Sequence, residues 1–190
     1  DPTADVDGHD ACRKICILAA LAYGQHVYPE QVATQGIRSV ALEDVSYAES
    51  KGYRIKLLGR ALRQGEKVCA YVAPHLVPDS SPLAGVEDVF NAIALTGNAV
   101  GDVMFYGRGA GKLPTASAVV GDIIDIARDP KRKRHNMWGP GREDLVVSPE
   151  NLAVRWYVRA DAAPAGVELL SRADAPEDEK AFLTAAMDEA

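Results

Sequence analysis

The sequence predicts an α+β fold, within the broad α/β class, in which a mixed, mostly antiparallel sheet carries helices packed on one face. Paired apolar stretches joined by short turns indicate antiparallel strands, and apolar residues at helical spacing indicate the helices. The strand pairs are residues 53–63 with 67–77 and 88–95 with 99–106, and the helices are residues 9–23, 42–51 and 114–128. The length of 190 residues and the 47% hydrophobic content fit a globular domain with a small addition.

The three predicted helices begin or end at residues that favour helix ends. Gly24 and Gly52 follow the first two helices, and glycine readily takes the left-handed conformation that ends a helix. Pro114 suits the first turn of the third helix, where its missing N–H leaves no helical bond unmade. Asp129-Pro130 ends that helix, because the residue before a proline avoids helical geometry.

Each predicted strand pair surrounds a turn. Gln64-Gly65-Glu66 separates the strands of the first pair and Thr96-Gly97-Asn98 those of the second, as expected for hairpins. A strand between Gly36 and Val40 is expected to add an edge to the sheet.

The C-terminal part is expected to be organised separately. We assign residues 1–128 to the main domain, residues 129–150 to a linker and residues 151–190 to a small appendage. The basic run at 131–134 is interpreted as part of a solvated linker, because the protein as a whole is acidic. Within the appendage, residues 152–160 predict a strand, and the acidic stretch from Pro176 predicts a helix.

Composition excludes several classes of protein. A net charge of −6 and a pI of about 5.2 argue against a general nucleic-acid binder. No apolar run is long enough to span a membrane, and the first residues lack a secretory leader pattern. Three cysteines cannot form a closed set of disulfides, which favours a reducing, cytoplasmic setting. Cys12 and Cys16, four residues apart, are interpreted as core residues, so no metal site is predicted.

The first residues of the chain bring together groups suited to acid–base chemistry. Asp10 and Lys14 lie one turn apart on the same face of the first helix, and Gly8 allows a tight turn from Asp5 into that helix. Two carboxylates and an ammonium at one helix end suit a small zwitterion: the carboxylates hold a substrate ammonium while lysine moves a proton at a substrate oxygen. The spacing is also typical of an ordinary surface ion pair.

A second motif, Gly107-Arg108-Gly109-Ala110-Gly111, lies between a predicted strand and a predicted helix. In that position the backbone can approach a phosphate or a cofactor ring closely. The spacing matches neither the dinucleotide-binding glycine pattern nor a P-loop, and the motif is also compatible with a plain tight connection.

Together these motifs resemble those of homoserine dehydrogenases. The pattern Pro2-x-x-Asp5-Val6-x-Gly8-x-Asp10-x-x-x-Lys14 resembles the family signature, and residues 105–128, FYGRGAGKLPTASAVVGDIIDIAR, resemble the segment that closes the catalytic domain. Residues 36–59 and 90–107 are also similar to the family, so the resemblance extends over residues 1–128.

The resemblance implies an oxidoreductase that interconverts L-homoserine and L-aspartate 4-semialdehyde with NADP or NAD, in the biosynthesis of threonine, methionine and isoleucine. It implies that Lys14 donates a proton to the aldehyde oxygen and that Asp5 and Asp10 surround the bound amino acid. It assigns Gly111, and less directly Gly109 and Thr115, to cofactor binding.

The resemblance also implies a homodimer built through the sheet, and an N-terminal dinucleotide-binding domain that these residues do not contain. We therefore expect a catalytic portion that is inactive by itself. The tail at 155–167 faintly resembles the start of an ACT regulatory module, which would be truncated here. The alternative is a non-catalytic amino-acid-binding or dimerisation module derived from the enzyme.

Overall fold

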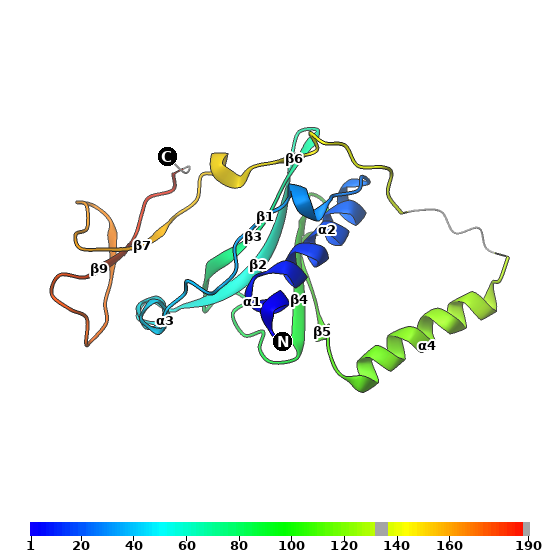
Figure 1. Ribbon diagram of the computed structural model, residues 1–190, viewed down its shortest axis with the longest axis horizontal. Helices are drawn as coiled ribbons and strands as arrows, with labels where there is room; N and C mark the ends of the chain where they lie inside the picture. Colours follow the sequence, from blue (N-terminus) through cyan, green and yellow to red (C-terminus); the bar gives the residue numbers. More distant parts are fainter. Residues whose placement is uncertain (132–136, 188–190) are drawn as a thin grey trace. The chain divides into compact units, whose positions relative to one another are not determined.

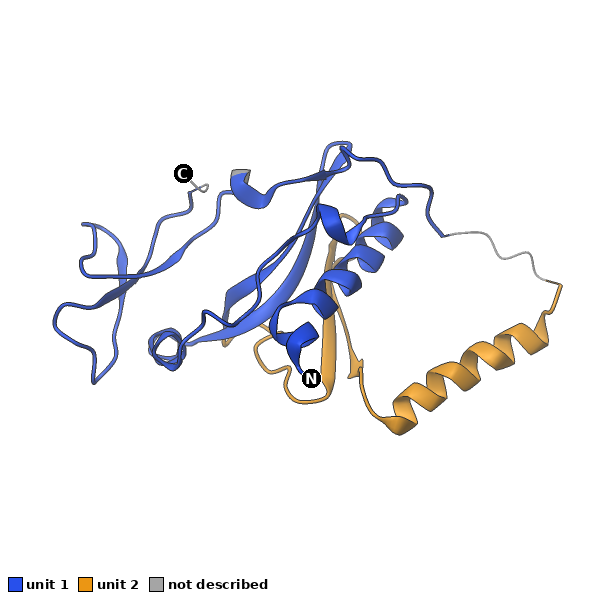
Figure 2. Cartoon of the chain, viewed as in Figure 1, with its two compact units in different colours: residues 1–78, 136–190 blue, residues 79–135 orange. Residues whose placement is uncertain are grey.

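The computed structural model describes residues 1–131 and 137–187, which form two compact units (Figures 1 and 2). The first unit consists of residues 1–78 with the described part of 136–190. The second consists of the described part of 79–135. The mixed α and β architecture predicted from the sequence is confirmed.

A mixed sheet forms the centre of the first unit. β2 (Tyr53–Gln64) and β3 (Lys67–Pro78) form a long antiparallel hairpin, in register from Tyr53 opposite Pro78 to Gln64 opposite Lys67. Two short strands, β1 (Ala33–Thr34) and β6 (Val146–Val147), pair in parallel with β3. The first predicted hairpin is therefore confirmed.

Helix α2 (His9–Tyr23) packs on this sheet, as Figure 1 shows. Its buried face meets alternate residues of β3, since successive side chains of a strand point to opposite faces. The residues of this core are Cys12, Ile15, Cys16, Ala19, Val27, Val32, Val68, Ala70, Val72 and Leu145. At Gly59 of β2 the helix lies directly on the strand: a Cβ there would be 2.9 Å from Ile15 Cβ. The predicted bounds of this helix are confirmed.

A short helix that the sequence did not predict, α1 (Thr3–Val6), precedes α2. The Asp1 carboxylate accepts the Thr3 backbone N–H at 3.0 Å and so satisfies a donor at the start of α1. Gly8, with φ of 80°, turns the chain from α1 into α2. That left-handed conformation is one that glycine adopts without strain.

A second, three-stranded sheet packs on helix α3 (Leu42–Glu49) within the first unit. It has the antiparallel order β7 (Tyr157–Ala160), β9 (Lys180–Leu183) and β8 (Glu168–Leu170). Tyr47 of α3 is buried against Leu170, Ala181 and Leu183 of this sheet. The predicted helix at 42–51 is confirmed.

Two predicted elements are wrong. Residues 36–40 form a turn, because the Ile37 N–H donates to the Val6 carbonyl instead of to a strand. The predicted acidic helix beyond Pro176 is the strand β9, since Ala181, Phe182 and Leu183 are buried between β7 and β8. Of the strand predicted at 152–160, only the last four residues form a strand, β7. The 3₁₀ helix η2 (Pro149–Asn151) lies before it in the chain.

Part of the predicted linker lies on the first unit. Trp138 Nε1 donates to His26 Nδ1 at 3.1 Å, and Gly139 pairs with Gln25. Leu145, 1% exposed, enters the core beneath α2, and β6 follows it. Most of the basic run at 131–134 lies outside the described residues.

The second unit contains an antiparallel ribbon and a helix. β4 (Phe90–Gly97) and β5 (Gly101–Arg108) confirm the second predicted hairpin, with a turn slightly later than expected. Helix α4 (Lys112–Arg128) confirms the third predicted helix, and none of its residues is buried.

Candidate functional site

The predicted proton donor forms an ion pair at the start of α2. Lys14 Nζ lies 2.7 Å from Asp10 Oδ2, and the side chains are 56% and 43% exposed. A pair this open to water contributes little to stability. The structure thus brings together two of the three predicted N-terminal site residues and leaves their charged groups accessible from solvent.

Asp5 lies on α1, one short turn before Gly8, and its side chain is exposed. The Gly8 N–H donates to the Asp5 carbonyl at 3.2 Å, so the backbone of the two helices is joined through this turn. Asp5 and Asp10 therefore lie on either side of one glycine turn, as the sequence predicted.

That turn is held against the sheet. A Cβ on Gly8 would lie 3.1 Å from Thr34 Cγ2 of β1 and 3.2 Å from Val72 Cγ1 of β3. Both the left-handed backbone and the close packing therefore favour glycine at this position.

An ion pair that the sequence did not predict, between Arg38 and Asp7, also holds this turn. Arg38 Nε donates to Asp7 Oδ1, and its Nη2 donates to Asp7 Oδ2 at 3.2 Å. The Arg38 guanidinium keeps the pKa of Asp7 below its ordinary value, chiefly through this hydrogen bond. A signal was present in the sequence, because Gly36, Ile37 and Arg38 begin a stretch that resembles the family.

The glycine-rich motif occupies the predicted connection in the second unit. It follows β5 and leads into α4, so the expected order of strand, glycine turn and helix is confirmed. Gly111 has a φ of 116°, which L side chains rarely adopt, and its carbonyl accepts the Thr115 N–H. A Cβ on Gly109 would lie 2.1 Å from Asn91 Nδ2. The backbone conformation therefore favours glycine at 111, whereas a side chain at 109 would have to displace the Asn91 side chain.

Lys14 and Gly111 belong to different units, so their roles in one site stay a prediction. Within the first unit the structure pairs Lys14 with Asp10, and within the second unit it places the glycine turn between β5 and α4.

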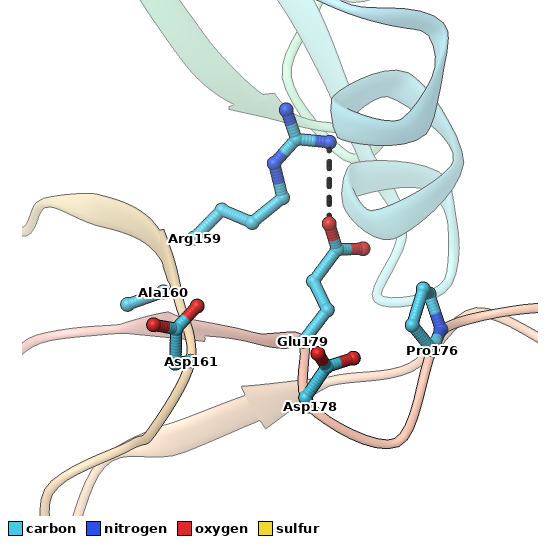
Figure 3. A pocket seen from close by; sticks show the side chains of 6 residues that line it. All are labelled: Arg159, Ala160, Asp161, Pro176, Asp178 and Glu179. Carbon is cyan, nitrogen blue, oxygen red and sulfur yellow. Dashed lines mark ion pairs between the residues drawn. The ribbon is translucent and has the colours of Figure 1, made fainter.

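The C-terminal sheet has a hollow of about 290 Å³, lined by Arg159, Ala160, Asp161, Pro176, Asp178 and Glu179. Figure 3 shows Arg159 directed toward Glu179, with their charged groups 3.8 Å apart. None of the predicted site residues lines this hollow. Two of its charged side chains, Arg159 and Glu179, also take part in the contacts that attach the sheet to α3.

Those contacts centre on Asp44, which is 8% exposed. Its carboxylate accepts the Tyr157 hydroxyl at 2.8 Å and the Ala41 N–H at 2.8 Å, and Arg159 Nε lies 3.4 Å away. Burial, followed by the bond to Asp44, raises the pKa of Tyr157. Nearby, the Tyr47 hydroxyl donates to Glu179 at 2.9 Å.

The cysteines are core residues, as predicted. Cys12, Cys16 and Cys69 are free thiols with 5% exposure or less. Burial and the neighbouring Cys12 raise the pKa of Cys16 to about 12, which makes it a poor nucleophile and a poor metal ligand at neutral pH. In the described residues, no helix combines the length and apolar character needed to cross a bilayer.

Comparison with known proteins gives a consistent family. The homoserine dehydrogenase family model matches residues 1–124. The homoserine dehydrogenase of Neisseria gonorrhoeae is 48% identical over 169 residues, which cover 85% of this chain and 39% of that protein.

Solved structures agree. A homoserine dehydrogenase from Thiobacillus denitrificans matches the whole chain over 48% of its own length, with a TM-score of 0.83 and 34% identity. A hyperthermophilic archaeal homoserine dehydrogenase in complex with NADPH matches 68% of this chain and 35% of its own, with a TM-score of 0.52 and 32% identity. The chain thus spans less than half the length of these relatives. It belongs to the homoserine dehydrogenase family of oxidoreductases.

Proposed function

We propose that these residues form the catalytic and substrate-binding portion of an NAD(P)-dependent enzyme that interconverts L-homoserine and L-aspartate 4-semialdehyde. The observation that carries the proposal is the accessible Asp10–Lys14 pair beside the Gly8 turn, within the segment that the family model matches. The substrate is a small zwitterion with one carbonyl or hydroxyl group to be transformed, and the charged groups of this turn suit such a molecule.

In this proposal the carboxylates of Asp5 and Asp10 hold the substrate ammonium, and Lys14 transfers the proton. During reduction the Lys14 ammonium donates a proton to the aldehyde oxygen as that oxygen gains negative charge; during oxidation the neutral amine accepts the hydroxyl proton. Asp10 restrains Lys14 at 2.7 Å and limits the directions in which its amine can point.

The glycine turn fits a nicotinamide dinucleotide. Apart from Gly107 and its two chain neighbours, no described residue has an atom within 4 Å of the place where Gly107 would carry a Cβ. Gly111, which has no side chain to block an approaching ligand, lies at the N-terminus of α4, a helix of 17 residues. Exposed backbone N–H groups at such an end favour a negatively charged ligand. When bound, the dinucleotide supplies or accepts the hydride. Gly109, Gly111 and Thr115 are the residues proposed to contact it, and the choice between NADP and NAD is left to the remainder of the enzyme.

Lys14 provides the direct test. In the full-length protein, Lys14→Ala is expected to lower turnover by orders of magnitude, because the developing oxyanion loses its proton donor. Lys14→Arg is expected to be nearly as inactive, since a guanidinium does not release its proton near neutral pH. Turnover is measured as the change in reduced dinucleotide absorbance with L-homoserine.

Arg13→Ala is the matched control, because Arg13 is the adjacent exposed cation on α2. It is expected to retain turnover. Near-normal turnover of Lys14→Ala would remove Lys14 from the mechanism. Wild-type protein without activity toward homoserine would instead favour the non-catalytic binding module.

The proposal includes a homodimer formed through the second-unit ribbon. Both strands expose large apolar side chains: Ile93, Leu95, Met104, Phe105 and Tyr106. A second copy of the chain is the partner proposed to cover them.

A further inference from the structure

The segment that follows β1 makes a second set of contacts with the turn between Asp5 and Asp10. Gly36 lies against that turn so closely that a Cβ would be 2.2 Å from the Val6 carbonyl oxygen and 2.6 Å from Asp7 Cα. Both of those atoms belong to backbone, which cannot move aside as a flexible side chain can. Glycine is therefore required here by close approach.

The next residues complete the contact. The Ile37 N–H donates to the Val6 carbonyl at 2.9 Å, and Arg38 makes its two-pronged hydrogen bond to Asp7. On the other side, the Gln35 N–H donates to the Val72 carbonyl at 2.8 Å, which anchors the segment to β3. The turn is thus bound to the central sheet through residues 35–38.

We propose that Gly36 and Arg38 are positioning residues for the substrate-binding turn, fixing the separation of Asp5 and Asp10 without touching substrate themselves. This inference rests on the proposed function, which assigns those carboxylates to the substrate ammonium. Asp7 lies between them in sequence, and the two hydrogen bonds from the planar Arg38 guanidinium fix the orientation of the Asp7 carboxylate.

The position of Lys14 depends less on these contacts. It lies within α2, one turn beyond Asp10, and α2 is held by its own packing on Gly59 and β3. Loosening the turn is therefore expected to weaken binding of the amino acid more than it slows proton transfer. Uniform loss of substrate binding raises KM and leaves kcat little changed.

The test uses the full-length enzyme with Arg38→Met. KM for L-homoserine is expected to rise by between about 10-fold and 100-fold, as for other residues that orient a binding group, with a smaller change in kcat. Arg38→Lys keeps the charge without the fork and is expected to recover only part of the loss. Exchanging the two residues, Asp7→Arg with Arg38→Asp, is expected to recover KM further because it restores an ion pair.

Arg54→Met is the matched control. Arg54 forms an exposed ion pair with Glu49 at 3.2 Å in the same unit, at the start of β2, and its replacement is expected to leave KM unchanged. Gly36→Ala is a second way to disturb the turn between Asp5 and Asp10, because the added methyl group meets the backbone of that turn. It is expected to raise KM in the same way as Arg38→Met.

Amide hydrogen exchange of residues 3–10 provides a readout that does not require activity. Exchange is expected to quicken in Arg38→Met and to match wild type in Arg54→Met. If exchange quickens in Arg38→Met but its KM for L-homoserine is unchanged, the positioning role is overturned. The role is also overturned if Arg38→Met only lowers the fraction of enzyme that is active and leaves KM unchanged. If the wild-type enzyme does not act on homoserine, the proposed function fails, and the contact itself is still judged by exchange.

Discussion

At the scale of single residues, packing contacts explain why glycine occupies certain positions in the first unit, which the sequence pattern alone does not explain. Gly59 looks like a weak point in a predicted strand, since glycine has low strand propensity. In the fold it is the point where α2 approaches β2, with Ile15 directly above it. The sequence predicts a strand that begins at Gly36, but in the fold Gly36 is pressed against the backbone of the turn between Asp5 and Asp10.

Cys16 gives a prediction of pH dependence. Its pKa is raised from 9.0 to about 12 by burial and by Cys12, so the folded state favours the neutral thiol. The stability that this contributes is fully present below the ordinary pKa near 9 and is lost as the pH rises toward 12. The difference in unfolding free energy between wild type and Cys16→Ala is therefore expected to shrink from pH 8 to pH 11.

Urea denaturation at several pH values measures this difference. Tyrosines that titrate in the same range affect both proteins, so their contribution cancels in the comparison. A difference that stays constant across the range would show that the Cys16 thiol does not titrate as its surroundings imply.

At the scale of elements, the two long hairpins and the three main helices follow from local pattern, because apolar spacing and turn residues agree there. The C-terminal strands do not. β9 carries acidic residues before it and a short apolar run, a pattern equally compatible with a helix. Pairing with β7 and β8, together with burial against Tyr47, decides in favour of a strand.

The attachment of that sheet to α3 gives a second prediction. Tyr157→Phe removes the hydroxyl that donates to the buried Asp44 carboxylate. Leaving a buried acceptor short of a partner costs about 1 to 3 kcal/mol. Amide exchange in β7 and β9 is expected to quicken accordingly, while exchange in α2 stays unchanged.

Glu168→Gln serves as the control for this substitution. Glu168 pairs with Arg155 in the same sheet, but both side chains are largely exposed, at 40% and 45%. Its replacement is expected to leave exchange in β7 and β9 unaltered. Equal effects of the two substitutions would mean that Asp44 is not the centre of the attachment.

At the scale of the whole molecule, the ribbon of the second unit predicts self-association. Phe105 and Tyr106 are 65% and 53% exposed, and the neighbouring residues of the ribbon are also apolar. Phe105→Asp is expected to shift the chain from dimer to monomer, because a charge buried in a dimer interface without a partner is costly. Sedimentation velocity over a range of concentrations measures the change.

Leu42→Asp is the comparison, since Leu42 is 83% exposed on α3, outside the ribbon. It is expected to leave the sedimentation coefficient unchanged. Wild-type chain that sediments as a monomer at high concentration would contradict the proposed dimer.

The sequence by itself determined the main helices, both hairpins, the family and the two motifs that carry the proposed site. These depend on local spacing or on ordered motifs, which need no knowledge of distant contacts. Tertiary structure decided the turn at residues 36–40 and the strand β9. It also decided the hydrogen bond from Trp138 to His26 and the ion pair between Asp7 and Arg38. The physical reason is the same in each case: the backbone and side-chain groups involved find their hydrogen-bond partners far along the chain, where no local pattern records them.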